Sequence, residues 1–293
     1  DRKRRNLQES CRLTRILSDC QQLAGCVSVC QQVVDGVHAG RMGPPTALGS
    51  TELRYCTASG EEVVTTLADV EVAAVAAGSP VREFSWHPRQ GNYPGWLWTA
   101  TTGTLVGYES LLERDRVLLA DFDVAVTGIA SQPFWLSGLD EGVQRRHAPD
   151  YLLACADGSV VVVDVKPAPM CQEPVVAAVL EWTGRLCRSR GWRYEVFHGG
   201  DAVVMANLRF LAQGRRSMFL DVECVTVVSA AGRSGMTLGQ IEGRVSGFDP
   251  LDVRASVLAL LWRQAWTTDL TRPLSSRSVV SVPVKEKRCR AAA

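Results

Sequence analysis

The chain has 293 residues, of which 46% are hydrophobic and 22% are charged, so it can bury the cores of two compact domains. Lysine and arginine together number 32 against 31 acidic residues, and the formal net charge is +1. This balance excludes a protein that attracts nucleic acid by its overall charge. Any contact with DNA must come from local patches.

The sequence pattern argues against a membrane span or a secretion signal. No run approaches the roughly 18 apolar residues that a span requires. The basic start, Asp1 to Arg5, is followed by polar residues. We therefore expect a cytoplasmic protein that makes no membrane contact. The 10 cysteines include no Cys-x-x-Cys pair, so we expect them to be mostly reduced and buried rather than bound to a metal.

Residues 1–45 are predicted to form an N-terminal arm, helical or disordered, of unknown role. Apolar residues recur there at three-to-four spacing, and Gly25 weakens the pattern. Residues 51–80 follow with a predicted strand, a Ser59-Gly60 turn and a helix that ends near Gly78. The aromatic residues between 84 and 98 are expected to pack together.

Residues 51–213 are predicted to form one domain with its catalytic core at about 104–200. The pattern predicts a helix at 106–119, strands at 124–136, 151–155 and 159–165, a helix at 175–190 and a strand at 193–197. This order indicates an α/β domain.

Residues 216–285 are predicted to form a second domain, which begins near residues 213–217. Helices at about 216–229, 237–246 and 250–264 precede two short strands around residues 271–274. Three helices followed by a hairpin is the order of a winged-helix domain. Residues 286–293 form a basic tail.

Three charged residues stand where two neighbouring strands can bring them together. Asp150 precedes the first strand, and Asp164 and Lys166 close the second, where alternate residues point to the same face. A two-residue turn between the strands would place Asp150 opposite Val165 and separate the charges. A three-residue loop with Gly158 in a left-handed conformation places Asp150 opposite Asp164, and we predict that register.

A third acid on the preceding helix would complete an oxygen-rich pocket for Mg²⁺, for which Mn²⁺ is expected to substitute. Glu109 and Glu113 are four residues apart on one face of the predicted helix, and either could reach the pocket. The cation would activate water for phosphodiester hydrolysis, and Lys166 would stabilise the transition state. The alternative interpretation is a structural salt bridge at the end of a buried strand.

These residues belong to a longer ordered set that resembles the TnsA-like endonuclease subunits of heteromeric transposases. The similarity covers about residues 82–200 and is carried by Gly107-Tyr108-Glu109-Ser110-Leu111-Leu112-Glu113-Arg114-Asp115, Asp121-Phe122-Asp123, Ser131-Gln132-Pro133, His147-Ala148-Pro149-Asp150-Tyr151 and Val163-Asp164-Val165-Lys166-Pro167. The resemblance implies a restriction-endonuclease-like mixed sheet flanked by helices, followed by a winged-helix-like domain.

The resemblance also implies the roles of the site residues. The catalytic set would be Glu113, Asp150, Asp164 and Lys166, with the three acids as metal ligands. The family glutamate follows a serine by three residues, which favours Glu113 over Glu109. Some members carry glutamine at the position of Asp164.

The function that the resemblance implies is cut-and-paste DNA transposition. Members cut the 5′-side strand at transposon ends in double-stranded DNA, while a separate DDE-type transposase cuts and joins the 3′ ends. Their C-terminal region contacts an AAA+ regulator. Residues 1–45 match no part of the family pattern, so their deletion should leave DNA cutting intact.

Two other functions remain open at this stage. One is a stand-alone restriction-type or repair-type nuclease, and the other is a non-catalytic module of the same fold that docks DNA or a partner. Five basic residues are candidate DNA contacts: Arg145, Arg146 and His147 beside the proposed site, and Arg254 and Arg263 in the C-terminal region. Their alternative role is to keep a loop or a surface soluble.

Overall fold

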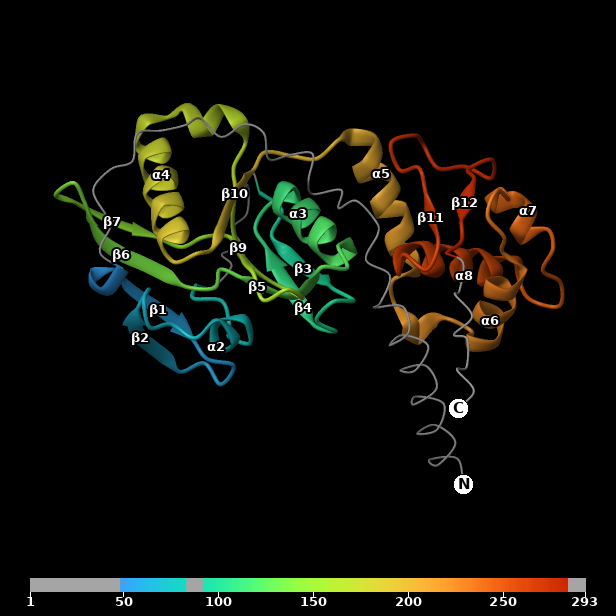
Figure 1. Cartoon of the computed structure of the whole chain (residues 1–293), viewed down its shortest axis with the longest axis horizontal. Coiled ribbons are helices and arrows are strands. Elements are labelled where there is room, and N and C mark those ends of the chain that lie inside the picture. Colours follow the sequence, from blue (N-terminus) through green and yellow to red (C-terminus); the bar gives the residue numbers. More distant parts are fainter. Residues whose placement is uncertain (1–47, 83–91, 284–293) are drawn as a thin grey trace, which may run out of the picture. The chain divides into compact units, whose positions relative to one another are not determined.

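The computed structural model describes residues 48–82 and 92–283, which form a mixed α/β structure with several sheets (Figure 1). The predicted N-terminal arm, the basic tail, and Phe84 and Trp86 of the aromatic segment lie outside the described residues. In the described ranges no helix has the length and apolar character needed to cross a bilayer. The cysteines in the described ranges are free thiols, and Cys187 and Cys224 are the buried ones among them.

A four-stranded mixed sheet carries the candidate site, with its strands in the order β10-β9-β8-β5. Strands β5 (Val126–Ser131), β8 (Tyr151–Cys155) and β9 (Val160–Val165) pair antiparallel, whereas β10 (Arg193–Phe197) runs parallel to β9. All six residues of β9 are buried. This burial explains the run of four valines at 160–163, because a strand covered on both faces needs no polar alternation.

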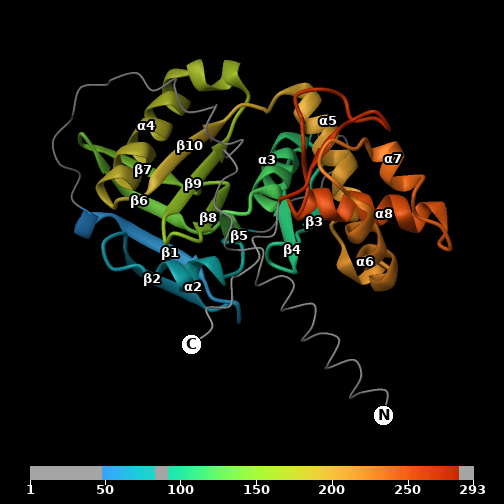
Figure 2. The ribbon, with the colours of Figure 1, turned by 45° about the vertical axis from the view of Figure 1, so that its right-hand side comes forward.

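Helices α3 (Leu111–Phe122) and α4 (Pro174–Ser189) lie on opposite sides of these strands (Figure 1, Figure 2). The odd-numbered valines of β9 belong to the same core cluster as Val117 of α3. The even-numbered valines belong to a different cluster, which contains Trp182 of α4. The alternation of side chains along one strand therefore attaches a helix to each face of the sheet.

A second, fully antiparallel sheet packs into the α4 cluster, with its strands in the order β2-β1-β6-β7. Its strands are β1 (Glu52–Cys56), β2 (Glu62–Thr66), β6 (Trp135–Asp140) and β7 (Val143–His147). Leu53 and Leu136 join Trp182 in the core. The short helix α2 (Val72–Ala76) follows β2, and the hairpin of β3 (Gly95–Trp98) and β4 (Leu105–Tyr108) precedes α3.

The C-terminal part consists of helices that precede a two-stranded antiparallel sheet. These elements are α5 (Ala202–Leu211), α6 (Val222–Ala231), α7 (Leu238–Glu242), α8 (Pro250–Trp262), β11 (Thr267–Thr268) and β12 (Val280–Ser281). Their core cluster contains Leu208, Val228, Ile241 and Val257, and it also contains Leu118 of α3. The core is thus continuous across the predicted boundary at residues 213–217.

The predicted elements were partly wrong in the region before the hairpin. The helix predicted from residue 106 begins at Leu111, because Ser110 caps it with a side chain that accepts from the Glu113 N–H at 3.1 Å. The strand predicted at 124–136 is two strands, β5 and β6, separated around Gln132 and Pro133. Tyr93 and Trp96 are more than half exposed, so the aromatic segment is not uniformly packed.

Other predicted elements were confirmed. The strands at 151–155 and 193–197 have the predicted bounds. The strand predicted at 159–165 begins one residue later, and the helix predicted at 175–190 begins and ends one residue earlier. The three C-terminal helices and the two strands that flank residues 271–274 also occur in the predicted order, with shorter helices.

Candidate active site

The hairpin of β8 and β9 has the predicted register. The ladder pairs Tyr151 with Val163, and its continuation places Asp150 opposite Asp164. The Cys155 N–H donates to the Ser159 carbonyl at 2.9 Å, which closes a three-residue loop. Gly158 in that loop has a φ of 81°. The left-handed glycine therefore sets the alignment of the two aspartates.

Asp150 is buried at the start of β8, with only 4% of its surface exposed. Its Oδ2 accepts from the Val165 N–H at 2.7 Å and from Lys166 Nζ at 3.1 Å. Burial raises the pKa of Asp150, and the neighbouring Asp164 charge adds to that effect, while Lys166 opposes it. Burial lowers the pKa of Lys166, but the carboxylates around it outweigh burial and the net pKa is raised.

Glu113 lies in the first turn of α3, where the cap holds its carboxyl group. Its Oε1 accepts from the Ser110 hydroxyl at 3.0 Å, and its Oε2 accepts from the Glu109 N–H at 2.8 Å. Burial raises the pKa of Glu113 to about 7, and the charge of Asp150 contributes to the same rise. Glu109 instead pairs with Arg82 at 2.6 Å. The geometry thus separates the two candidate acids, and Glu113 is the one coupled to Asp150.

Asp164 is fully buried and already holds two hydrogen-bond partners. His147 Nε2 lies 2.8 Å from its Oδ1 and 3.0 Å from its Oδ2, and the Tyr194 hydroxyl donates to Oδ2 at 2.5 Å. Burial raises the pKa of Tyr194, and the Asp164 charge raises it further, so the phenol stays a donor. Tyr194 was not among the predicted site residues, and it reaches Asp164 because β10 pairs in parallel with β9.

Asp150, Asp164 and Lys166 lie together at one end of the β8–β9 hairpin. The charges of Asp150, Asp164 and Glu113 each act on Lys166 and raise its pKa. The structure therefore brings the predicted residues within electrostatic reach of one another. Asp164 is hydrogen-bonded to His147 and Tyr194, Asp150 to Lys166, and Glu113 to the cap of α3.

The oxygen donors of these carboxylates suit a divalent cation, but their side chains do not form a coordination site in the described structure. Within residues 48–82 and 92–283, no three acidic, histidine or cysteine side chains are arranged to hold a metal ion. Glu113 and Asp150 are two buried, mutually repelling carboxylates, and a hard cation with oxygen ligands would relieve that repulsion. Asp164 is fully buried and hydrogen-bonded to His147 and Tyr194, so it is the least accessible of the three acids to a cation.

The candidate DNA contacts beside the site lie on strand β7 rather than in a loop. Arg145 Nε donates to Asp140 at 2.9 Å, and the Arg146 guanidinium lies 4.1 Å from the centre of the Trp135 ring. His147 is turned to Asp164. Arg146 is exposed and is the member of this group that stands most freely toward solvent.

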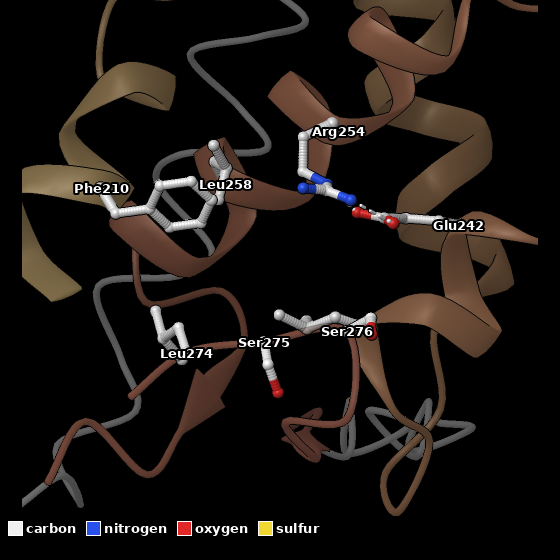
Figure 3. A pocket seen from close by; sticks show the side chains of 8 residues that line it. Phe210, Glu242, Arg254, Leu258, Leu274, Ser275 and Ser276 are labelled. Atoms are coloured by element: carbon white, nitrogen blue, oxygen red, sulfur yellow. Dashed lines mark hydrogen bonds and ion pairs between the residues drawn. The ribbon is translucent and has the colours of Figure 1, made fainter. Parts of the chain in front are cut away.

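Arg254 lines a separate pocket of about 120 Å³ in the C-terminal part (Figure 3). Its Nη2 donates to Glu242 Oε2 at 2.8 Å, and Figure 3 shows the two side chains facing each other. Arg263 caps the end of α8, and burial lowers its pKa. The pairing with Glu242 neutralises Arg254 and so weakens its attraction for a phosphate.

The fold and the site together define a mixed α/β protein with a buried carboxylate and lysine cluster at the end of a hairpin. No protein-family model matches this chain, and a search of the curated proteins finds no match.

Proposed function

We propose that the protein is a metal-dependent DNA endonuclease that hydrolyses phosphodiester bonds. The observation that carries the proposal is the register of the β8–β9 hairpin, which aligns Asp150 with Asp164 and leaves Lys166 hydrogen-bonded to Asp150. Glu113 reaches the same place from α3. A salt bridge that only neutralised a buried strand end would not need a third, electrostatically strained acid.

Glu113 and Asp150 are the residues that would hold a Mg²⁺ or Mn²⁺ ion, with Asp164 as a further predicted ligand. When bound, such a cation lowers the pKa of water and neutralises charge on a phosphate. The oxygen-only donor set agrees with these two ions. Cation binding would also remove the proton that burial holds on Glu113 near neutral pH.

Lys166 is the cationic group of the site that the chain itself supplies. Its side chain is half-buried and its ammonium lies 3.1 Å from Asp150 Oδ2, and the surrounding carboxylates raise its pKa, so it keeps its charge at neutral pH. It would hold a phosphate oxygen and stabilise the charge that develops there. Asp164, fixed by Tyr194 and His147, would keep the end of β9 and therefore Lys166 in position.

The remaining parts of the proposal follow from the resemblance. The mixed sheet between α3 and α4 is compatible with a restriction-endonuclease-like fold, and the three helices and hairpin after residue 216 are compatible with a winged-helix-like domain. We propose a TnsA-like subunit that cuts the 5′-side strand at transposon ends. Its partners would be double-stranded DNA, a DDE-type transposase and an AAA+ regulator at the C-terminal region.

The first prediction is that Asp150→Ala abolishes cutting. In strand-specific cleavage of labelled transposon-end DNA with Mg²⁺ and a partner DDE-type transposase, the variant should lose at least about 100-fold in rate. Asp157→Ala, the same change at the exposed hairpin loop, is the matched control and should cut normally. Cutting without the transposase would indicate a stand-alone nuclease. If the wild type and Asp150→Ala gave the same cleavage while the partner transposase was active, this chain would have only a docking role.

A further inference from the structure

Gln132 lies directly beside Asp150 on the sheet. It follows β5, and the β5–β8 ladder, which pairs Ser131 with Tyr151, continues with Gln132 opposite Asp150. The Gln132 N–H donates to the Asp150 carbonyl at 2.8 Å. Gln132, Asp150 and Asp164 therefore occupy one row across three adjacent strands.

The side chain of Gln132 is buried without a hydrogen-bond partner. Only 2% of the residue is exposed, and neither Oε1 nor Nε2 has a partner among the residues that the structure describes. Burying an amide without partners is unfavourable, and most buried side-chain amides in proteins are paired. A leucine or methionine of similar volume would avoid that cost, so stability alone does not explain a glutamine here.

The backbone at Gln132 is unfavourable as well. Its φ of 43° lies in the left-handed region, which glycine adopts more easily than glutamine. The residue also precedes Pro133, and a residue before proline prefers extended backbone. Two separate costs at a single residue beside Asp150 are typical of a functional position rather than of a structural one.

We propose that Gln132 is a positioning residue whose carboxamide binds a water molecule beside Asp150 and orients it for attack on the phosphate. The carboxamide offers one acceptor and one donor pair, and water can satisfy both because it donates and accepts. A phosphate oxygen could satisfy only the donor. The role in attack rests on the proposed endonuclease function, whereas the binding of water does not.

The decisive variant is Gln132→Leu, which keeps the approximate volume and removes both polar atoms. We expect it to melt at the same or a higher temperature than the wild type, because it removes an unpaired buried amide. We also expect kcat for DNA cleavage to fall about 100-fold with KM nearly unchanged, because the loss concerns orientation and not DNA binding. Gln144→Leu, at an exposed position of β7, is the control and should alter neither quantity.

The same variant separates a structural role from a positioning role. A Gln132→Leu protein that melts at a markedly lower temperature, or that retains the wild-type kcat, would overturn the proposal. Water binding is tested without DNA by crystal structures of the wild type and the variant. An ordered water within hydrogen-bond distance of both Gln132 amide atoms is expected only in the wild type, and its absence there refutes the inference even if the protein proves to cut no DNA. If the water is present and no cleavage occurs, the proposed endonuclease function fails instead.

Discussion

Glu113 holds a carboxyl group that is half protonated near neutral pH, because burial raises its pKa to about 7. The charge of Asp150 adds to this rise, whereas the hydrogen bonds that the carboxyl group accepts from the Glu109 N–H and the Ser110 hydroxyl oppose it. A protonated acid cannot serve as a cation ligand. The neutral form of Glu113 therefore stabilises the protein without a cation, and the ionised form is the one that can bind a cation.

The raised pKa of Glu113 makes the folding stability depend on pH. Its ordinary value is 4.5, so between pH 4.5 and 7 the folded state keeps a proton that the unfolded state releases. The stabilisation is complete below the lower value and is lost as the pH rises toward 7. The difference between the two pKa values corresponds to about 3 kcal/mol in the free energy of unfolding.

Glu113→Gln should remove this part of the pH dependence and should be more stable than the wild type at pH 8. Urea unfolding at pH 4.5 and pH 8 measures the difference. Glu109→Gln, where the acid pairs with Arg82 at the surface, is the control and should keep the wild-type slope. If the free energy of unfolding of Glu113→Gln changed with pH as much as that of the wild type, Glu113 would not be the source of the pH dependence.

Some residues of the candidate site could be predicted from the sequence, and others could not. Asp150, Asp164 and Lys166 could be predicted because strand alternation and loop length determine which side chains meet. The hydrogen-bond partners of Asp164 could not be predicted in this way. His147 comes from the second sheet, and Tyr194 comes from a strand 30 residues further along the chain. Gln132 was noticed only as part of a motif, because burial without a partner is invisible in a sequence.

At the level of elements, the β8–β9 hairpin depends on one glycine conformation. Gly158 has a φ of 81°, and open space surrounds the position where a Cβ would lie. Gly158→Ala should therefore cost only the conformational strain of a left-handed alanine, about 1 kcal/mol in the free energy of unfolding. Gly49→Ala, which has equal space and no positive φ, should cost less.

Cation binding distinguishes strain from a change of register in the Gly158→Ala protein. If the hairpin keeps its register, calorimetry with Mn²⁺ should give the wild-type affinity despite the lower stability. A loss of affinity in a folded variant would mean that the loop slipped and separated Asp150 from Asp164.

The elements that the sequence pattern missed share a physical cause. Strand β7 consists of polar residues on a sheet edge with one exposed side, so it lacks the apolar alternation that marks a strand. Helix α5 follows β10 after a short connection. It carries an apolar residue, Phe210, on its exposed side as well as Met205 and Leu208 on its buried side, so no clean apolar stripe marks it as a helix. The buried valine run of β9 and helix α4 were predicted to within one residue at each end.

At the level of the whole molecule, the C-terminal core extends into the part that carries the candidate site. Leu118 of α3 belongs to that core, and Phe122 packs edge-on against Trp262 of α8 with ring centres 5.2 Å apart. Gln264 Nε2 donates to the Phe122 carbonyl at 2.8 Å. The predicted boundary near residues 213–217 stays a prediction, and contacts between distant residues could not be read from composition.

Leu118→Ala should lower the free energy of unfolding of the full chain by about 2 to 5 kcal/mol, because it opens a cavity where the two parts meet. Urea unfolding followed by tryptophan fluorescence and by circular dichroism should still give coincident transitions. Leu105→Ala, with a side chain that is 58% exposed, is the control and should cost little. Two separate transitions in the wild type would show that the shared core does not couple the parts.

The buried valines of β9 also affect the tendency of the newly synthesised chain to aggregate. A run of β-branched residues is prone to stack with copies of itself before the sheet has formed. Asp164 and Lys166 place two charges at the end of that run, and charges in this position suppress aggregation of newly made chains. The residues proposed for catalysis would thus also act as gatekeepers. Alanine variants at these positions are expected to yield less soluble protein, whatever their effect on DNA.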